Sequence, residues 1–183
     1  MIEALGSTRP HSTAPGFSAF SLQPSAFSLG SNLGDRLENL TLARGKCAAL
    51  PQTRVVAVSS VYETEPVGAP PGSPFFLNAV LLLETRLAPL ELLHAAQSIE
   101  NELGRVRSIP NAPRTLDMDL LFVGDLLLDT PELTLPHPRA HLRRFVLAPL
   151  AELLPDFVLP NQTRTVAQLL AKLPPIPPSD AIS

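Results

Sequence analysis

The sequence has no tryptophan, a single cysteine and only two lysines, and it contains no apolar run of membrane-spanning length. The lone Cys47 has no partner for an internal disulfide or for a cysteine zinc site, which indicates a reducing compartment. The first 24 residues also lack the continuous apolar core of a signal peptide. We therefore expect a cytoplasmic protein.

The chain also lacks an excess of positive charge, since its formal net charge is −3. Nucleic-acid and membrane-surface binding favour a basic excess, so we expect neither partner. Lys46 precedes Cys47, where a P-loop needs Ser or Thr, and no G-x-G-x-x-G motif occurs. His137 and His141 lack the adjacent glutamate and the helix of a zinc-protease pair. Any phosphate site must therefore be a local one.

What the 183 residues do contain is enough apolar sequence for one core, with 45% hydrophobic and 17% charged residues. Residues 1–24 are rich in Ser, Pro, Ala and Gly and show neither helical nor strand periodicity, so they predict a disordered N-terminal extension. Residues 174–183 predict a flexible proline-rich tail. We expect a single domain over residues 25–173.

The word SAFSL occurs twice, beginning at Ser18 and at Ser25. Only the second copy leads into a glycine turn and a helical pattern, so residues 25–31 are predicted to form the first strand. Asn32 is predicted to be the N-cap of the following helix, with Asp35 three residues later. The buried stripe of that helix is predicted to consist of Leu33, Leu37 and Leu40.

Further helices and strands are predicted from local composition and from the positions of proline and glycine. Apolar, β-branched runs predict strands at residues 53–62, 75–85 and 115–123, and a proline- and glycine-rich loop at residues 63–74. A helix is predicted from Pro89 to a cap at Gly104, with a stripe of Leu92, Ala96, Ile99 and Leu103. A hairpin is expected near residues 125–135 and short helices over residues 145–173. The order β-α-β-β-α-β predicts an α+β, ferredoxin-like antiparallel sheet with helices on one face.

Asp117 and Asp119 interrupt the apolar strand near its start. Alternate residues of a strand share a face, so the two carboxylates project together. Two adjacent anions repel each other, and Mg²⁺ would remove the repulsion while water and substrate phosphate complete its shell. The alternative is a solvated acidic pair on an exposed sheet face.

Arginines surround the acidic pair in the sequence. The planar guanidinium group suits phosphate oxygens, and the combination of carboxylates, a divalent cation and arginines is typical of phosphoryl transfer. Six arginines fall within residues 105–144: Arg105, Arg107, Arg114, Arg139, Arg143 and Arg144.

Four blocks between residues 26 and 160 occur in a recognisable order: LGSNLGDRLENL, SSVYETEPVG followed by FFLNAV, GRVRSIPNAPRTLDMDLLFVG, and LPHPRAHLRRFVLAPLAEL. Together they resemble the 6-hydroxymethyl-7,8-dihydropterin pyrophosphokinase family of folate biosynthesis. The resemblance implies the ferredoxin-like fold and the transfer of diphosphate from ATP to the hydroxymethyl oxygen of the pterin, which releases AMP. It also implies two Mg²⁺ ions.

The resemblance assigns a role to each matched position. The implied catalytic residues are Arg105, Arg114, Asp117 and Asp119, and the two aspartates hold the metal ions. Implied ATP contacts are Gln97, Glu100, Arg107, Leu120, Thr134, His137 and Arg143. Implied pterin contacts are Thr64, Pro66, Val67, Gly68, Phe76, Asn78 and Phe145. Two aromatic faces can sandwich the flat pterin ring, while an amide can both donate to and accept from its edge. No strong general base is assigned.

The chain departs from the family pattern near the ATP side. Pro110-Asn111-Ala112 stands before Pro113 where some members carry Arg-Trp-Gly, and the loop is one residue shorter. Glu132 replaces an arginine of some members, and Pro138 replaces a tyrosine. The loops at residues 105–113 and 68–74 are expected to close over the substrates.

Two other functions compete with this hypothesis. One is a non-catalytic ferredoxin-like nucleotide-binding module, and the other is a diphosphokinase that acts on a different alcohol. An RNA-binding module should carry aromatic and basic side chains on its central strands, whereas Asp117 and Asp119 stand there. We expect a monomer whose partners are ATP and the pterin.

Overall fold

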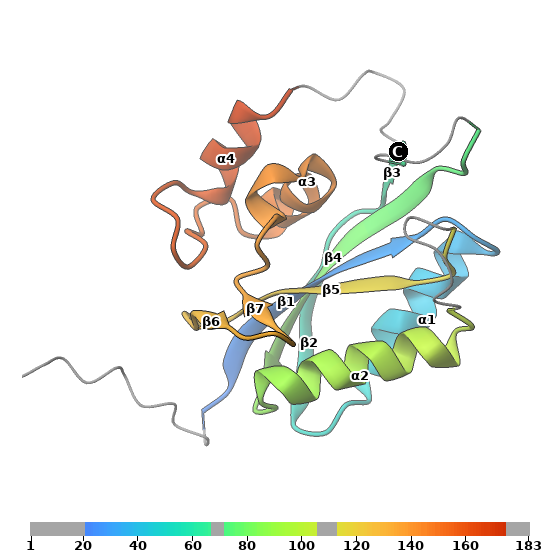
Figure 1. Ribbon diagram of the computed structural model, residues 1–183, viewed down its shortest axis with the longest axis horizontal. Coiled ribbons are helices and arrows are strands. Elements are labelled where there is room, and N and C mark those ends of the chain that lie inside the picture. The colour runs from blue at the N-terminus through green and yellow to red at the C-terminus, as the bar shows by residue number, and fades with distance from the viewer. Residues whose placement is uncertain (1–20, 67–71, 106–112, 175–183) are drawn as a thin grey trace, which may run out of the picture.

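The computed structural model describes residues 21–66, 72–105 and 113–174. Its main sheet has the order β2-β4-β1-β5, and β3 pairs with β4 beyond the end of β2 (Figure 1). The strand pairs are antiparallel. Their bounds are β1 Gln23–Ser31, β2 Thr53–Val58, β3 Tyr62–Thr64, β4 Phe76–Thr85 and β5 Asp117–Val123. The predicted α+β, ferredoxin-like sheet is thus confirmed.

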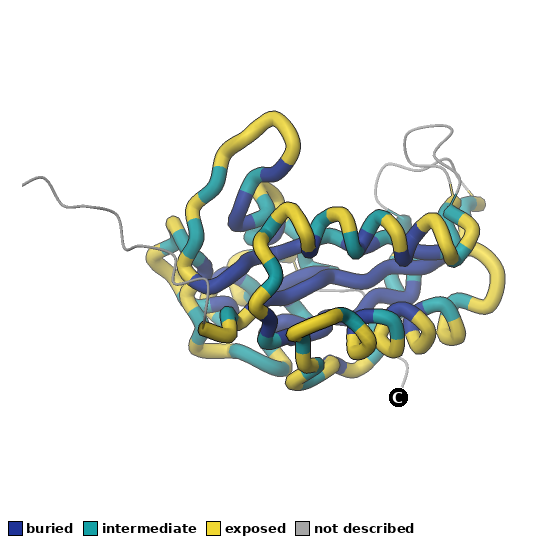
Figure 2. The backbone as a smooth tube through the Cα atoms, turned by 90° about the horizontal axis from the view of Figure 1, so that it is seen from below, coloured by how far each residue is buried: buried dark blue, intermediate teal, exposed yellow. Residues whose placement is uncertain are grey.

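Helices cover both faces of this sheet. Two long helices, α1 (Arg36–Ala48) and α2 (Pro89–Glu102), lie on one face, and two C-terminal helices, α3 (Arg144–Leu153) and α4 (Val166–Lys172), lie on the other (Figure 1). Each face has its own cluster of buried apolar side chains. Figure 2 shows the buried strands between helices whose outer surfaces are exposed. The predicted one-sided helical layer therefore holds only for α1 and α2.

The second helix and the hairpin agree with the sequence. Pro89 begins α2, and Gly104 follows its end with a φ of 81°. Leu92, Ala96 and Ile99 are buried along its inner stripe. The predicted hairpin is formed by β6 (Leu128–Asp129) and β7 (Thr134–Leu135).

The first helix begins later than predicted. Its N-cap is Asp35, whose Oδ1 accepts a hydrogen bond from the backbone N–H of Glu38 at 3.0 Å. The prediction of Asn32 as the N-cap is wrong. Leu33 precedes the helix and is 46% exposed, and Leu37 is 57% exposed. The buried stripe consists instead of Leu40, Ala43 and Cys47.

The strand predicted at residues 53–62 is interrupted at Ser59. The hydroxyl of Ser59 accepts a hydrogen bond from the backbone N–H of Val80 at 2.9 Å, and Ser59 N donates to Val80 O. This side-chain bond replaces the next rung of the ladder, so β2 ends at Val58 and β3 starts at Tyr62. The carboxylate of Glu152 in α3 accepts hydrogen bonds from Ser60 N and from the Tyr62 hydroxyl, which ties β3 to the second helical layer.

A β-bulge divides β5. Phe27 of β1 pairs with Leu120 and Ala26 pairs with Phe122, so Leu121 is the extra residue. As a result Leu120 packs in the cluster beneath α1 and α2, whereas Leu121 and Phe122 pack in the cluster beneath α3 and α4. β5 is also an end strand of the main sheet, and the carbonyl of Leu121 accepts a hydrogen bond from outside the sheet, from His137 N.

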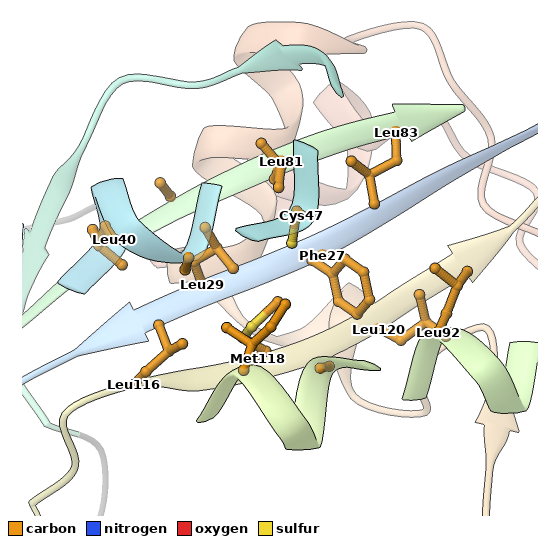
Figure 3. Close-up of a cluster of buried hydrophobic side chains, with 14 of the residues drawn as sticks. Phe27, Leu29, Leu40, Cys47, Leu81, Leu83, Leu92, Leu116, Met118 and Leu120 are labelled. Atoms are coloured by element: carbon orange, nitrogen blue, oxygen red, sulfur yellow. The ribbon is translucent and has the colours of Figure 1, made fainter. Parts of the chain in front are cut away.

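Cys47 lies fully buried in the helix-side core, beside Leu29 and Leu81 (Figure 3). Burial raises the pKa of its thiol to about 12, so the reactive thiolate is scarce at neutral pH. We expect the native protein to leave an aromatic disulfide reagent unreacted, and the denatured protein to release one equivalent of thiolate per chain. Equal labelling rates in both states would show that the helix-side core is open.

Within the part of the chain that the structure describes, no helix is both long and apolar enough to cross a membrane.

Candidate active site

Asp117 and Asp119 stand at the start of β5 with their side chains on the same face of the sheet. Met118 between them points the other way and is 5% exposed in the core beneath α2 (Figure 3). The two carboxylates are partly exposed, at 27% and 33% of the side chain. The strand thus presents two accessible anions from a rigid, buried backbone, as the sequence predicted.

Two arginines hold Asp117. Arg105 Nη1 donates to Asp117 Oδ1 at 2.7 Å, and Arg114 Nη1 donates to Asp117 Oδ2 at 2.9 Å. Arg105 follows α2, and Arg114 lies three residues before Asp117 at the entrance to β5. Each oxygen of the carboxylate therefore has its own cation, which is the strong, charge-assisted kind of hydrogen bond.

A third arginine and a histidine face Asp119. Arg143 Nη1 donates to Asp119 Oδ2 at 3.2 Å, and His137 Nε2 lies 3.8 Å from the same oxygen. The backbone N–H of His137 donates to the carbonyl of the bulged Leu121 at 2.8 Å, which places the ring beside the acidic pair. The hydrogen bond to Leu121 thus brings His137, sixteen residues further along the chain, to this site.

The surroundings of His137 favour the neutral form of its imidazole. Burial lowers its pKa below the ordinary value, and Arg143 and Arg139 act in the same direction, whereas Asp119 raises it. Its Nδ1 accepts a hydrogen bond from the backbone N–H of Arg139 at 3.1 Å, so Nε2 carries the hydrogen. A neutral N–H donor therefore points toward the space around Asp119.

Glu100 is a buried carboxylate that holds two parts of the site together. It is 2% exposed near the end of α2, and its Oε1 accepts hydrogen bonds from the Arg105 guanidinium and, at 2.7 Å, from the backbone N–H of Met118. One buried carboxylate thus joins α2 to β5 and holds the arginine that binds Asp117. The resemblance implies an ATP contact for Glu100, whereas the structure buries its side chain.

Gly30 lies between the acidic pair and a second group of predicted residues. It pairs with Asn78 in β4 on one side and with Asp117 in β5 on the other. Asn78 is 4% exposed and donates from Nδ2 to the Thr64 hydroxyl at 2.8 Å. The Arg114 guanidinium lies 5.8 Å from the centre of the Phe76 ring, close enough for a cation–π contact. The two halves of the predicted site are therefore neighbours across one glycine.

Phe145 reaches the site from the first turn of α3. The Arg143 guanidinium lies 5.4 Å from the centre of its ring. Phe76 and Phe145 thus each carry an arginine that also binds one of the aspartates.

Asn32 is a site residue that the sequence interpretation missed. Its Oδ1 accepts from the backbone N–H of Arg114 at 2.7 Å, and its own N–H donates to the carbonyl of Arg114. Its Nδ2 donates to the carbonyl of Pro74 at 3.3 Å. The sequence feature that could have identified Asn32 is its place as a polar residue directly after a buried strand. We interpreted it as the N-cap of α1, which is in fact Asp35.

Several predicted residues lie apart from this group. Gln97 is half-buried on α2, one turn before Glu100. The side chain of Leu120 is in the core, and Thr134 donates to Asp129 in the β6–β7 hairpin. Arg144 donates to the carbonyls of Leu170 and Leu173 at the end of α4 and not to either aspartate of the site. Pro66 is at the edge of the described chain, and Val67, Gly68 and Arg107 lie outside the described residues, as do most of the two loops expected to close.

The acidic pair fits Mg²⁺. Within the described segments, no group of three or more His, Cys, Asp or Glu side chains is placed to hold a metal. Two carboxylates are nevertheless sufficient for Mg²⁺, which usually takes its other ligands from water and substrate phosphates. Both aspartates are accessible, and the contacts of Asp119 with Arg143 and His137 both fall on Oδ2. Such a donor set suits an ion that is shared with a phosphate substrate.

We expect Gly30→Ala to weaken binding on the Asn78 side of the site, which the resemblance assigns to the pterin. The added Cβ would lie 3.2 Å from Asn78 Oδ1 and 3.5 Å from a ring carbon of Phe76. Overpacking of this kind costs about 1 to 3 kcal/mol, so the dissociation constant for the pterin should rise about tenfold in calorimetry. Gly45→Ala on α1 is the control, because its Cβ would meet nothing within 4 Å. Unchanged pterin affinity in Gly30→Ala would place the pterin elsewhere.

Comparisons with known proteins identify the family of this chain. The family model for 7,8-dihydro-6-hydroxymethylpterin-pyrophosphokinase (HPPK) matches residues 26–155. A 2-amino-4-hydroxy-6-hydroxymethyldihydropteridine pyrophosphokinase from Pseudomonas aeruginosa is 49% identical over 146 residues, covering 80% of this chain and 89% of the relative. One from Haemophilus influenzae is 45% identical, covering 73% of this chain and 82% of the relative.

A likeness to solved structures supports the fold. A crystal structure of Plasmodium falciparum HPPK-DHPS with pteroate matches with a TM-score of 0.65 at 14% identity, over 82% of this chain and 42% of the solved chain. This chain thus spans less than half the length of that solved protein.

Proposed function

Because the chain belongs to the 7,8-dihydro-6-hydroxymethylpterin-pyrophosphokinase family, we propose that the acidic pair and its arginines form the active site for the family's reaction. The chain is a pyrophosphokinase of folate biosynthesis. It transfers diphosphate from ATP to the hydroxymethyl oxygen of 6-hydroxymethyl-7,8-dihydropterin and leaves AMP and the pterin diphosphate. The observation that carries the site assignment is the contact of Asp117 and Asp119 with three arginines from three separate segments.

The proposed metal ligands are Asp117 and Asp119, which hold two Mg²⁺ ions together with ATP. When bound, Mg²⁺ neutralises charge on the transferred phosphates. Arg105, Arg114 and Arg143 are oriented by the aspartates and present their remaining N–H groups to phosphate oxygens. Fixed cations of this kind favour a transition state in which negative charge is redistributed, because they need no reorganisation during the reaction.

The nucleotide lies, in this proposal, along the end of α2 and the segment that carries His137. The neutral imidazole donates from Nε2 to a phosphate oxygen. Glu100 acts through Arg105, since its carboxylate is occupied by Arg105 and Met118 N. Leu120 contributes through its backbone, because its side chain is in the core. The remaining proposed ATP contacts are Gln97, Arg107, Thr134 and Arg143.

The pterin lies on the other side of Gly30. Asn78 and Thr64, which already share a hydrogen bond, present polar groups to the edge of the ring. Phe76 and Phe145 supply the apolar faces, and each also contacts an arginine of the phosphate side. Pro66, Val67 and Gly68 complete the proposed pterin contacts. This arrangement brings the pterin hydroxymethyl group toward the phosphates held at β5.

The site favours an enzyme over a non-catalytic nucleotide-binding module, since both carboxylates and the arginines that bind them are present together. We further propose that the protein acts in the cytoplasm as a monomer, without nucleic acid or membrane partners. We also propose that residues 25–173 form a single domain, which β1 extends by Gln23 and Pro24.

The test is the identity of the nucleotide product. Purified protein with ATP, Mg²⁺ and 6-hydroxymethyl-7,8-dihydropterin should form AMP and the pterin diphosphate in equal amounts, and chelation of Mg²⁺ should stop the reaction. Formation of ADP would indicate a single phosphoryl transfer. Turnover of another alcohol at a higher kcat/KM would indicate a different diphosphokinase.

A further inference from the structure

Two of the proposed pterin contacts, Thr64 and Phe76, lie at one end of the β3–β4 ladder. Thr64 pairs with Phe76 at the last rung, and Glu63 pairs with Leu77 one rung before. Beyond this rung the chain leaves the sheet, so further rungs brace the Thr64–Phe76 pair on one side alone. A contact that holds both strands at this point would set the width of the proposed pterin site.

Arg36 makes such a contact. Its Nη1 donates to Glu63 Oε1 at 2.7 Å and to the backbone carbonyl of Phe75 at 2.8 Å. Glu63 directly precedes Thr64, and Phe75 directly precedes Phe76. One nitrogen of Arg36 thus joins the two strands next to both proposed pterin residues. The side chains of Arg36 and Glu63 are only 31% and 22% exposed, so water does not fully screen the ion pair.

The element that carries Arg36 is itself well fixed. Arg36 is the first residue of α1, directly after the N-cap Asp35. Asn39, one turn into the helix, donates from Nδ2 to the Ser31 hydroxyl at 3.1 Å and to the carbonyl of Leu33 at 3.0 Å. The start of α1 is therefore tied to the end of β1, which is the strand that also carries Gly30.

We propose that Arg36 and Glu63 form a clamp that holds the end of the β3–β4 ladder at the width that the pterin ring requires. Arg36 is a positioning residue in this role, because it acts through Glu63 and Phe75 and not on the substrate. The proposal rests on the function proposed above. Its consequence is selective: loss of the clamp affects the pterin, whereas the arginines and aspartates of the phosphate side keep their contacts.

The test compares Arg36→Met, Glu63→Gln and the double variant in steady-state kinetics and in pterin calorimetry. Arg36→Met keeps the apolar stem but removes both hydrogen bonds, so the KM and dissociation constant for the pterin should rise about tenfold. Glu63→Gln keeps an acceptor for Arg36 and should raise them about threefold. The double variant should resemble Arg36→Met, because coupled residues are not additive. The KM for ATP and kcat should change less than about twofold in all three.

Arg54→Met is the matched control. Arg54 pairs with Glu84 between β2 and β4, remote from Gly30, and its loss should leave both KM values unchanged. An unchanged pterin affinity in Arg36→Met, or an equal rise in the KM for ATP, would overturn the clamp. If Arg36→Met does not fold, Glu63→Gln alone decides the question by the same comparison. Absence of AMP formation by the wild-type protein would instead reject the proposed function, while calorimetry with the pterin still tests the clamp.

Discussion

Asp117→Asn is expected to reduce kcat by about a thousandfold, which is the upper range for loss of one electrostatic group in an active site. Asparagine has nearly the same shape, so the packing against Gly30 should persist. It removes the negative charge that holds Arg105 and Arg114 and replaces one acceptor oxygen with a donor. Both arginines then lose their orientation, and a bound cation loses a ligand.

Pterin binding should survive this change, because Asn78, Thr64 and the two phenylalanines do not depend on the Asp117 charge. Calorimetry with the pterin and AMP assays at saturating substrate separate the two effects. Asp125→Asn is the control, since Asp125 is exposed in the turn after β5. Turnover by Asp117→Asn within about tenfold of wild type would reject the role of this carboxylate in charge neutralisation. Asp119→Asn should behave alike, through the loss of its pairing with Arg143.

Glu100→Ala is expected to lower the free energy of unfolding by about 3 to 5 kcal/mol, as the loss of one partner of a buried ion pair does. The substitution leaves the Arg105 guanidinium, 15% exposed, without its buried counter-ion. It also leaves the N–H of Met118 without the acceptor that Glu100 supplies. Chemical denaturation measures the stability, and kcat measures the second consequence, since Arg105 then binds Asp117 alone.

Glu102 provides the comparison for this prediction. It lies two residues later on α2 and pairs with Lys46 on the exposed side of the helix. Exposed ion pairs contribute little to stability, so the free energy of unfolding of Glu102→Ala should be close to that of the wild-type protein. The free energy of unfolding of Glu100→Gln should lie between those of the wild-type protein and Glu100→Ala, because the amide oxygen still accepts a hydrogen bond from Met118 N. Equal stability of the two alanine variants would contradict a structural role for the buried carboxylate.

The sequence was sufficient for the strands and for the acidic pair because both follow from alternation along a chain. Asp117 and Asp119 are on one face of β5 for the same reason that Met118 is on the other. The arginines were also visible as residues, but their directions were not. Arg143 and Arg144 are adjacent, yet one binds Asp119 and the other holds the end of α4. Only the start of α3 decides which of the two side chains faces the sheet.

Other features depended on contacts between distant segments. Asn32 and Asp35 are both good capping residues, and local propensity does not distinguish them. The choice falls on Asp35 because the side chain of Asn32 is occupied by Arg114 and Pro74, which are far away in the sequence. Likewise, Glu100 follows Ala96 by four residues and has the spacing of the buried stripe, but a charged residue is not expected inside unless partners such as Arg105 and the Met118 N–H are present.

The bulge at Leu121 has a consequence for how this sequence tolerates length changes. Substitution of Leu121 by another apolar residue keeps the backbone path, so it should be accepted with small repacking. Deletion of the same residue would restore regular pairing with β1, and Phe122 and Val123 would keep their partners Ala26 and Ser25 and their faces of the sheet. It would, however, remove the carbonyl that positions His137. Among natural relatives, variation at this point of β5 should therefore consist of exchanges of residue and not of gaps.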